Sequence, residues 1–394
     1  GVELYFQTLD DKSECAGVYV GGKLHFDEIP PDLTKTWKYT GSIIDPKIEY
    51  AWLYANGDSL EKACPDELIE ELRRIQRRFR AYLKSFKIGR INLREHCFFD
   101  LVPDSFLLEF CEIKNKITEH VFETYEKPVN YELLNDIQKL MHKIKYQNLN
   151  LNQEGCRELY YTSMGRSKAN ELLKKYNYID YNMFGTVTGR LTTNENSFPI
   201  LTVKRKYRRL IKPHNDWFIS LDYNGAEIRT FFELAGQEQP KGDVHEWNMK
   251  NIFEDEIDRK TAKLRFFAWF YNPKSNIIEA DCYNREKILD KWHKEGYINT
   301  IYGRKIQVDK RKAFNYLIQS TTSDRVLSKA VEIDKFLDGK KSFISHIIHD
   351  EIVIDFSDDE RIYVPEIKKI FEEGDYKVNV NAGKNCYDFE ELKI

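Results

Sequence analysis

Two short apolar runs near the C-terminal end of the sequence predict a β-hairpin. Residues 343–348 and 352–356 are rich in β-branched and aromatic side chains, which favour strands. The polar residues between these runs, His349, Asp350 and Glu351, suit a tight turn. Taken alone, the pattern indicates an acidic hairpin tip. The more specific alternative is a metal site, which requires a second carboxylate at the end of a neighbouring strand.

The remaining hydrophobic and polar pattern divides the chain into helical and strand-rich regions. A further apolar strand at 217–221 stops at an acid, Asp222. Strand-like alternation starts at about residue 176 and returns at 341–394, so a sheet interrupted by a helical insertion is expected. Helical periodicity predicts helices in four places: 65–87, 105–150, much of 241–340, and 362–373.

Asp222 and Asp350 form a candidate metal site. Strands far apart in sequence can be neighbours in a sheet that an insertion interrupts. Mg²⁺ prefers oxygen ligands and commonly takes one or two carboxylates together with substrate phosphates. Two such ions can stabilise the attacking and leaving oxygens of phosphoryl transfer. Either Asp taken singly is better explained as a turn or helix-cap residue, so the interpretation depends on their surroundings.

The segment 258–272 carries a stripe of cations and aromatic rings. Arg259, Lys263, Phe267 and Tyr271 recur every four residues and would share one face of a helix. The two cations could grip a triphosphate and leave its sugar or base near the rings. The alternative is an amphipathic helix with core aromatics and solvated cations.

The formal net charge of −3 implies that any affinity for nucleic acid must come from local basic patches. Two patches are evident. One is the helix expected at 65–87, which is equally well explained as a solvated surface helix because its first turns are acidic. The other is the run at 204–209. Their basic residues are Arg73, Arg74, Arg77, Arg78, Arg80, Lys84, Lys87, Lys204, Arg205, Lys206, Arg208 and Arg209.

Composition excludes several classes of protein. With 394 residues and 41% hydrophobic side chains, the chain is too apolar to be disordered. No apolar run reaches the length of a membrane span, and no secretory signal is evident, so an intracellular protein is expected. The seven cysteines lack any Cys-x-x-Cys pair, which argues against a zinc site or a disulfide framework and favours reduced cysteines.

Together, these segments resemble the family A DNA polymerases, the DNA polymerase I type. LDYNGAEIR resembles the first palm motif of that family, commonly DYSQIELR. RKTAKLRFFAWFYN resembles its fingers-helix motif, RxxxKxxxFxxxYG, and HDE resembles its last palm motif. Supporting segments follow in the family's order: TVTGRLTT, DVH, YINTIYGRK and FNYLIQSTTSD. The resemblance covers roughly residues 180–356.

The resemblance implies an α+β fold, the right-hand polymerase fold, with an antiparallel palm sheet, helical fingers and a helical thumb. It implies template-directed addition of dNTPs to a primer 3′-hydroxyl, with two-metal phosphoryl transfer and release of pyrophosphate. The implied division of the chain is an N-terminal region of unknown role at 1–60, thumb and connecting helices at 61–175, palm at 176–240, fingers at 241–340, and the second part of the palm at 341–394.

The resemblance also assigns roles to individual residues. Asp222, Tyr223 and Asp350 would hold two Mg²⁺ ions, with Mn²⁺ as a substitute. Lys263 would donate a proton to pyrophosphate, and Glu351 would be an accessory carboxylate. The nucleotide would be bound by Arg259, Lys263, His245, Phe267, Tyr271 and the steric-gate Glu227. The DNA would be bound by Arg190, Asn315, Gln319 and His349 near the insertion site, and by Lys204, Arg205, Arg208, Arg73 and Arg77 along its backbone.

Some positions depart from the family pattern. Gly225 and Ala226 replace a polar residue and Ile of the first palm motif, and Asn272 replaces the Gly after the fingers Tyr. These changes bear on nucleotide choice and on how the fingers close. The first 150 residues contain no Asp-x-Glu pair, so no 3′–5′ exonuclease is expected in this chain.

The expected partners are primer–template DNA, dNTPs, and a processivity factor or separate exonuclease, with no membrane association. We expect a monomer in a bacterial or phage-infected cytoplasm, or in an organelle. Two alternatives stay open at this point. A single-subunit RNA polymerase would share the palm carboxylates, although Glu227 argues against it. A catalytically inactive DNA-binding replisome scaffold would keep the fold without the chemistry.

Overall fold

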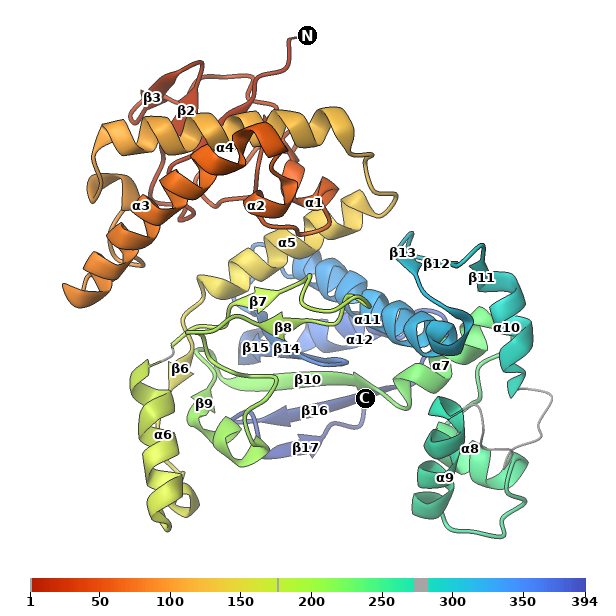
Figure 1. Cartoon of the computed structure of the whole chain (residues 1–394). Coiled ribbons are helices and arrows are strands. Elements are labelled where there is room, and N and C mark those ends of the chain that lie inside the picture. Colours follow the sequence, from red (N-terminus) through yellow and green to blue (C-terminus); the bar gives the residue numbers. More distant parts are fainter. Residues whose placement is uncertain (1, 176, 273–282) are drawn as a thin grey trace. The chain divides into compact units, whose positions relative to one another are not determined.

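The computed structural model describes residues 2–175, 177–272 and 283–394 (Figure 1). The chain forms two compact units, residues 1–142 and 143–394, and each is described by itself. The boundary between them falls inside the segment 61–175 that was assigned to the thumb and connecting helices. The finer division into thumb, palm and fingers stays a prediction.

The first unit combines small sheets with long helices. Its helices α3 and α4 pack against each other through a core that includes Leu72, Ile75, Phe106 and Ile113, and α3 confirms the helix expected at 65–87. The elements are β1 (Phe6–Thr8), β2 (Val18–Val20), β3 (Lys23–His25), β4 (Lys35–Thr36), β5 (Glu49–Tyr50), α1 (Ala51–Tyr54), α2 (Leu60–Ala63), η1 (Asp66–Leu68), α3 (Ile69–Ile88), η2 (Phe98–Asp100) and α4 (Asp104–Thr124). Helix α5 (Tyr131–Lys145) crosses the boundary between the units.

The expectation that all cysteines are reduced was wrong for one pair. Cys15 and Cys97 form a disulfide with a Cα–Cα separation of 5.5 Å. This bond was not predictable from local sequence, because the two residues are 82 positions apart and only the fold of the first unit brings them together. The other described cysteines are free: Cys64, Cys111, Cys156 and Cys386. Cys282 lies outside the described residues.

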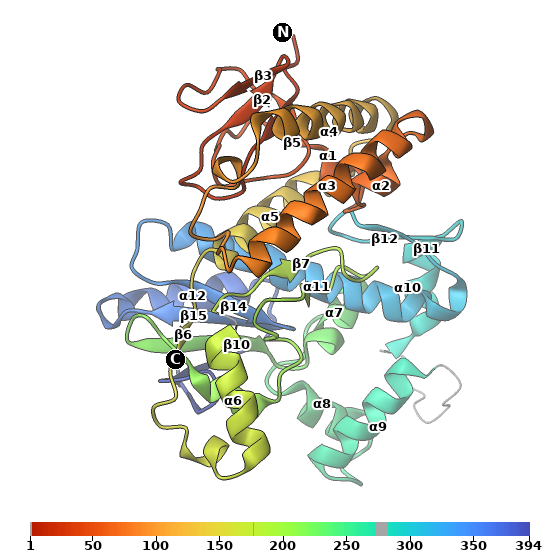
Figure 2. The ribbon, with the colours of Figure 1, turned by 60° about the vertical axis from the view of Figure 1, so that its left-hand side comes forward.

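A five-stranded antiparallel sheet organises the second unit (Figure 2). The strand order is β14-β15-β10-β16-β17. The central strand is β10, which carries the predicted metal ligand Asp222. The expected hairpin is confirmed as β14 and β15, and the expected neighbour of that hairpin is β10. The strands are β10 (Trp217–Tyr223), β14 (Phe343–Ile348), β15 (Glu351–Phe356), β16 (Val378–Gly383) and β17 (Phe389–Glu391).

Helices α11 (Lys310–Phe336) and α12 (Val364–Phe371) cover one face of this sheet. Tyr223 of β10 points to that face, because its ring stacks on Phe371 at 3.9 Å and its hydroxyl accepts a hydrogen bond from Arg325 of α11. Side chains alternate between the two faces of a strand. Asp222, the preceding residue, therefore lies on the opposite face.

The other elements of the second unit surround the sheet. Among them, α7 begins immediately after β10, and α8 lies beside α9 in both ribbon views (Figures 1 and 2). They are β6 (Asn150–Leu151), η3 (Arg157–Tyr160), α6 (Ser163–Lys175), β7 (Tyr181–Asn182), β8 (Thr192–Thr193), η4 (Arg205–Leu210), β9 (Ile211–Lys212), α7 (Ala226–Leu234), α8 (Val244–Asn251), α9 (Arg259–Tyr271), α10 (Arg285–Trp292), β11 (His293–Lys294), β12 (Tyr297–Asn299), β13 (Lys305–Gln307) and η6 (Asp358–Tyr363).

The region 241–340 was expected to be largely helical, but it also contains the three-stranded sheet β11-β12-β13. A two-residue turn joins β11 to β12, and both of its residues, Glu295 (φ 55°) and Gly296 (φ 80°), have positive φ. That conformation matches the twist of a hairpin. The strands are two or three residues long, which is too short for a periodicity to be visible in the sequence.

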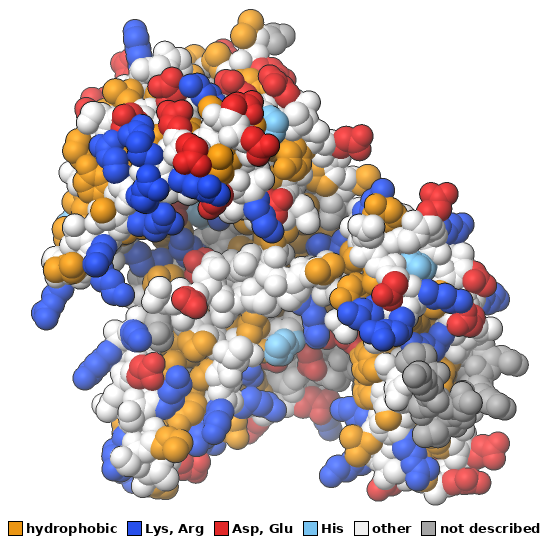
Figure 3. Space-filling model, in the orientation of Figure 1, with side chains coloured by type: hydrophobic (Ala, Val, Ile, Leu, Met, Phe, Trp, Pro, Cys, Tyr) orange, Lys and Arg blue, Asp and Glu red, His pale blue; other side chains and the backbone are white. Residues whose placement is uncertain are grey.

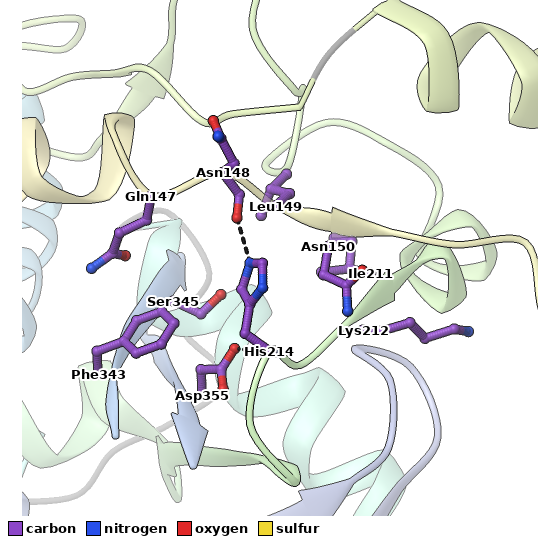
Figure 4. Close-up of a pocket in the computed structure, with 10 residues that line it drawn as sticks. All are labelled: Gln147, Asn148, Leu149, Asn150, Ile211, Lys212, His214, Phe343, Ser345 and Asp355. Carbon is purple, nitrogen blue, oxygen red and sulfur yellow. Dashed lines mark hydrogen bonds between the residues drawn. The ribbon is translucent and has the colours of Figure 1, made fainter. Parts of the chain in front are cut away.

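A small cavity lies beside β14 and β15 (Figure 4). His214 forms a hydrogen bond of 2.6 Å with the carbonyl of Asn148, and Asp355 accepts backbone N–H groups of His214 and Asn215. None of the residues that line the cavity belongs to the predicted site, so we assign them a structural role. Within the described ranges, no helix is both long and apolar enough to cross a membrane.

Candidate active site

The sheet brings the predicted carboxylates together. Asp222 on β10 is paired directly with Glu351 on β15, and Asp350 precedes Glu351 in the chain. Directly opposed residues of an antiparallel pair have Cβ atoms roughly 4.5–5.5 Å apart. The Glu351 carboxylate also accepts a hydrogen bond of 2.6 Å from Ser220, which lies on the same face as Asp222. Asp222 and Glu351 therefore share one face of the sheet, and Asp350 lies at the same end of it.

The tight turn of the hairpin places Asp350 at this end of the sheet. Ile348 pairs with Glu351, so the connection consists of His349 and Asp350 alone. His349 is exposed and has a φ of 52°, a conformation that few residues other than glycine adopt outside turns. The helix-cap alternative for Asp222 is wrong, since Asp222 lies inside β10 and the N-cap of α7 is Gly225.

Both candidate ligands have raised pKa values. Burial, and then the neighbouring carboxylates of Glu351 and Asp350, raise the pKa of Asp222 to about 6. Burial also raises the pKa of Asp350, which the charge of Arg190 partly offsets. Desolvated carboxylates crowded in this way need a cation to stay ionised. This electrostatic situation fits a divalent metal ion.

The donor set is nevertheless small. In the described part of the chain, no group of three or more His, Cys, Asp or Glu side chains is arranged to hold a metal ion. Mg²⁺ usually keeps several waters and takes only one or two protein carboxylates together with substrate phosphates. Asp222 and Asp350 supply that number. These residues therefore fit a metal ion whose coordination is completed by substrate phosphates and water. They do not fit a metal site in which the protein supplies all the ligands.

Helix α9 has two contrasting faces. Phe266, Trp269 and Phe270 are buried in the core beneath it. Arg259 and Lys263 are exposed, and the rings of Phe267 and Tyr271 are half-buried and stacked with centroids 5.9 Å apart. The stripe predicted from the sequence is thus present, with two exposed cations followed by two parallel rings, and the first cation, Arg259, forms an ion pair with Asp243. The alternative interpretation, in which the aromatic side chains of this helix belong to the core, holds for the opposite face.

His245 on α8 lies beside this stripe. Its ring is 5.8 Å from that of Phe267, only 4% of its surface is exposed, and its Nδ1 has no hydrogen-bond partner among the described residues. Burial, followed by the charge of Lys263, lowers the pKa of His245 to about 4. At neutral pH the imidazole is uncharged, and one nitrogen is left available for a ligand.

Glu227 and Arg190 lie close to the candidate metal-binding carboxylates. Burial and the charge of Asp350 raise the pKa of Glu227 to about 7, and Arg190 partly offsets this increase. The same Arg190 affects the pKa values of Asp350 and His349. One cation thus stands among these groups at the end of the sheet.

The turn that carries Arg190 rests on a buried ion pair that sequence analysis missed. The Arg304 guanidinium binds both carboxylate oxygens of Asp324 at 2.8 Å, and a Cβ on Gly189 would lie 2.4 Å from that guanidinium. Ser323 of α11 also donates to the Gly189 carbonyl. The only sequence signal was the presence of both charged residues within supporting family segments.

The predicted DNA contacts on α11 share one stripe. These are Asn315 and Gln319; Ser323, which was not predicted, follows at the same four-residue spacing, and all three side chains are half-buried. The side-chain oxygen of Asn315 has no hydrogen-bond partner. This stripe leads along α11 to the turn of Arg190. It therefore offers a row of half-buried polar groups that ends at the turn of Gly189 and Arg190.

The basic patches are only partly free. In the second unit, Lys204 and Arg205 are exposed, whereas Arg208 is half-buried and Arg209 forms ion pairs with Glu158 and Asp388. In the first unit, Lys and Arg side chains gather along α3 (Figure 3). Arg73 there pairs with Glu61, and Arg74 and Arg78 pair with Glu109, while Arg77, Arg80, Lys84 and Lys87 are exposed.

Comparison with solved structures identifies the architecture. The polymerase domain of Pol1 from M. smegmatis, solved in complex with DNA primer–template and dNTP, matches with a TM-score of 0.64 and 12% sequence identity. The match covers 98% of this chain and 96% of that domain. This chain has the polymerase-domain fold of DNA polymerase I. The α+β right-hand fold expected from the sequence is confirmed.

Sequence comparison also finds DNA polymerase I enzymes, from other organisms. The thermostable DNA polymerase I of Thermus aquaticus is 23% identical over 252 residues, which cover 51% of this chain and 30% of that enzyme. DNA polymerase I of Chloroflexus aurantiacus is 23% identical over 236 residues, which cover 46% of this chain and 25% of that enzyme. No family model matches the chain. The resemblance to family A DNA polymerases is confirmed, although the chain spans less than a third of these relatives' length.

Proposed function

We propose that this chain is a template-directed DNA polymerase that adds dNTPs to the 3′-hydroxyl of a primer. The observation that carries the proposal is the register that sets Asp222 opposite Glu351, with Asp350 at the adjoining turn. An exposed pair of cations on α9, Arg259 and Lys263, supplies the second element of the chemistry. The similarity to DNA polymerase I in sequence and fold supports the choice of substrate.

In the proposed reaction, the primer 3′-oxygen forms a bond to the α-phosphorus of the dNTP, and the bond from that phosphorus to the bridging oxygen of pyrophosphate breaks. Two Mg²⁺ ions, with Mn²⁺ as a substitute, would neutralise phosphate charge and lower the pKa of the attacking hydroxyl. Asp222 and Asp350 would hold these ions, together with the Tyr223 carbonyl. Glu351 would be an accessory carboxylate beside these ligands, and its hydrogen bond with Ser220 would fix its orientation.

Negative charge grows on the pyrophosphate as it leaves, so cations are needed where that charge develops. Arg259 and Lys263 would stabilise it, and Lys263 would donate a proton to the leaving oxygen. The unpaired Nδ1 of neutral His245 would add one hydrogen bond to the triphosphate. The parallel rings of Phe267 and Tyr271 would pack beside the sugar and the template base.

The primer and template would lie along the α11 stripe of Asn315 and Gln319, with Arg190 and His349 at the insertion site. Lys204, Arg205 and Arg208, and in the first unit Arg73 and Arg77, would contact the DNA backbone. We also propose the thumb, palm and fingers boundaries expected from the sequence. The remaining expectations belong to this proposal as well: a monomer, an intracellular location in a bacterium, phage-infected cell or organelle, and a separate processivity factor or exonuclease.

Extension of a labelled primer on a DNA template with Mg²⁺ tests the proposal. We expect template-directed extension with dNTPs and much less with rNTPs. Preferential extension with rNTPs would favour the RNA polymerase alternative. A folded protein that binds primer–template but extends no primer with either set of nucleotides would favour the scaffold alternative.

Replacement of Glu227 by Ala is expected to raise rNTP incorporation relative to dNTP by about 10- to 200-fold, the discrimination available from one group in a binding pocket. The half-buried carboxylate of Glu227 would no longer disfavour a 2′-hydroxyl. The ratio of kcat/KM for dNTP and rNTP measures this effect. Glu233→Ala on the same helix is the control, and an unchanged ratio in Glu227→Ala would contradict the steric-gate role.

Replacement of Arg77 by Ala is expected to weaken primer–template binding and to lower the salt dependence of log Kd by about 0.9, the value for one lost phosphate contact. Arg73→Ala is a comparison within the same helix, and its effect should be smaller because Arg73 already donates to Glu61 at 3.1 Å. Fluorescence anisotropy over a series of salt concentrations measures both slopes. Equal slopes for wild type and Arg77→Ala would exclude this contact.

A further inference from the structure

The loop after β10, the strand of Asp222, makes hydrogen bonds to the beginning of α8, which lies in the DVH segment. Asn224 is buried two residues beyond Asp222. Its side-chain N–H₂ donates to the carboxylate of Asp243 at 3.1 Å, and its side-chain oxygen accepts the backbone N–H of Val244 at 2.7 Å. One amide therefore connects the end of β10 to the first turn of α8.

The fully buried Arg229 fixes the orientation of this amide. Its Nη2 donates to the Asn224 side-chain oxygen at 3.0 Å, and its Nε donates to the Asn224 carbonyl at 3.2 Å. The same guanidinium donates to the carbonyls of Pro240 and Gly242. Because the amide oxygen must face the donors of Arg229 and Val244, the amide nitrogen must face Asp243.

Gly225 allows α8 to approach this closely. It has a φ of 62°, and a Cβ at this position would lie 2.4 Å from the Cγ1 of Val244. Both Asn224 and Gly225 depart from the DYSQIELR pattern. The joint is therefore formed by two adjacent residues that both differ from that motif.

Asp243 in turn holds Arg259 at the beginning of α9. Its carboxylate accepts the Nη2 of Arg259 at 2.7 Å and the Nε at 3.2 Å, and it also caps α8 by accepting the N–H groups of His245 and Glu246. Partial burial would raise the pKa of Asp243, but the hydrogen bonds from Arg259 and Glu246 outweigh it and hold that pKa well below its usual range. The pair occupies the edge of the guanidinium formed by Nε and Nη2, and within the described residues Nη1 makes no hydrogen bond.

We propose that Asp243, held in place by Asn224, is a positioning residue that orients Arg259 toward the triphosphate of the incoming nucleotide. This inference rests on the proposed polymerase function. A fixed guanidinium loses less conformational freedom when it binds an anion. Removing Asp243 should therefore cost nucleotide affinity even though it removes a negative charge. If Asp243 merely competed with phosphate for Arg259, its neutralisation would tighten binding.

Asp243→Asn tests this directly, since Asn caps a helix as well as Asp does. The measurement is the Kd of a dNTP for the enzyme bound to Mg²⁺ and a primer–template whose primer ends in a dideoxynucleotide, so that no turnover is needed. We expect about tenfold weaker dNTP binding, the effect of losing one strong interaction, with unchanged primer–template affinity. In an Arg259→Ala background, Asp243→Asn should cause no further loss.

Asp258→Asn is the matched control. Asp258 is the N-cap of α9 and precedes Arg259, but it bonds to the N–H of Thr261 instead of to that guanidinium. Asp258→Asn removes the same charge right beside Arg259 in the chain, and it should leave dNTP binding within about twofold. Asn224→Ala, with folding checked by circular dichroism, should weaken binding in the same direction as Asp243→Asn.

Unchanged or tighter dNTP binding by Asp243→Asn would overturn the inference. So would an equal loss in the Arg259→Ala background, because Asp243 would then act by another route. The proposed function fails separately: a wild-type protein that binds dNTP but extends no primer would refute the polymerase proposal, while the binding comparison would still decide the role of Asp243.

Discussion

Replacement of Asp350 by Asn is expected to reduce primer extension by about 10³-fold or more, a loss typical of removing charge stabilisation from phosphoryl transfer. Asn keeps nearly the same size and suits the two-residue turn, so the hairpin should keep its register. The raised pKa of Asp350 shows that its carboxylate is held at an energetic cost that a bound cation would offset. Single-turnover extension with Mg²⁺, together with primer–template anisotropy, measures activity and binding separately.

The matched control for this prediction is Asp359→Asn. Asp359 follows the other end of β15, is exposed and pairs with Lys341 at 2.7 Å, so its loss should leave extension unchanged. A pronounced loss of primer–template binding in Asp350→Asn would point to a DNA-binding role in place of a metal-binding one. Extension at the wild-type rate would show that the metal site is elsewhere.

Replacement of Asp324 by Ala is expected to lower the free energy of unfolding by about 3–5 kcal/mol, because it leaves the buried Arg304 guanidinium without its partner. Asp324 is fully buried, and both of its oxygens bind Arg304 at 2.8 Å. The midpoint of urea unfolding, followed by circular dichroism, measures this effect. The turn of Gly189 and Arg190, which rests on Arg304, should also become less well positioned, so primer extension should fall.

Asp334→Ala on the same helix is the control for stability. Asp334 pairs with Lys143 at the surface, and such pairs contribute only about 0–1 kcal/mol. Replacing both Arg304 and Asp324 by Leu should recover much of the stability, since no buried charge then lacks a partner. A loss below 1 kcal/mol in Asp324→Ala would show that water reaches Arg304 and that the pair does not support the turn.

The elements with strong local signals were predictable from the sequence. The hairpin β14–β15 followed from apolar runs around a polar turn, and α3, α4 and α12 followed from periodicity. The stripe on α9 followed from a four-residue repeat. The resemblance to family A polymerases added the order of the segments, and the fold comparison confirms that architecture.

Other features had no local signal. The disulfide of Cys15 and Cys97, the short sheet β11-β12-β13 and the buried pair of Arg304 and Asp324 depend on contacts between distant residues. The pattern around a lone Cys or Arg is the same whether or not a partner lies nearby in space. Very short strands also contain too few residues to show alternation.

The sequence by itself determined which residues could carry the chemistry: the acids that end apolar strands, and the cations and rings that repeat along one helix. Only the tertiary structure decided that Asp222 faces Glu351, that the buried Arg229 orients Asn224, and that Asp243 holds Arg259. The physical reason is that residue type sets the charge and hydrogen-bonding capacity of a group locally. The pKa of a group and the direction in which its side chain points depend on strand register, burial and the neighbouring groups. These are set by strands and helices that are remote in the chain.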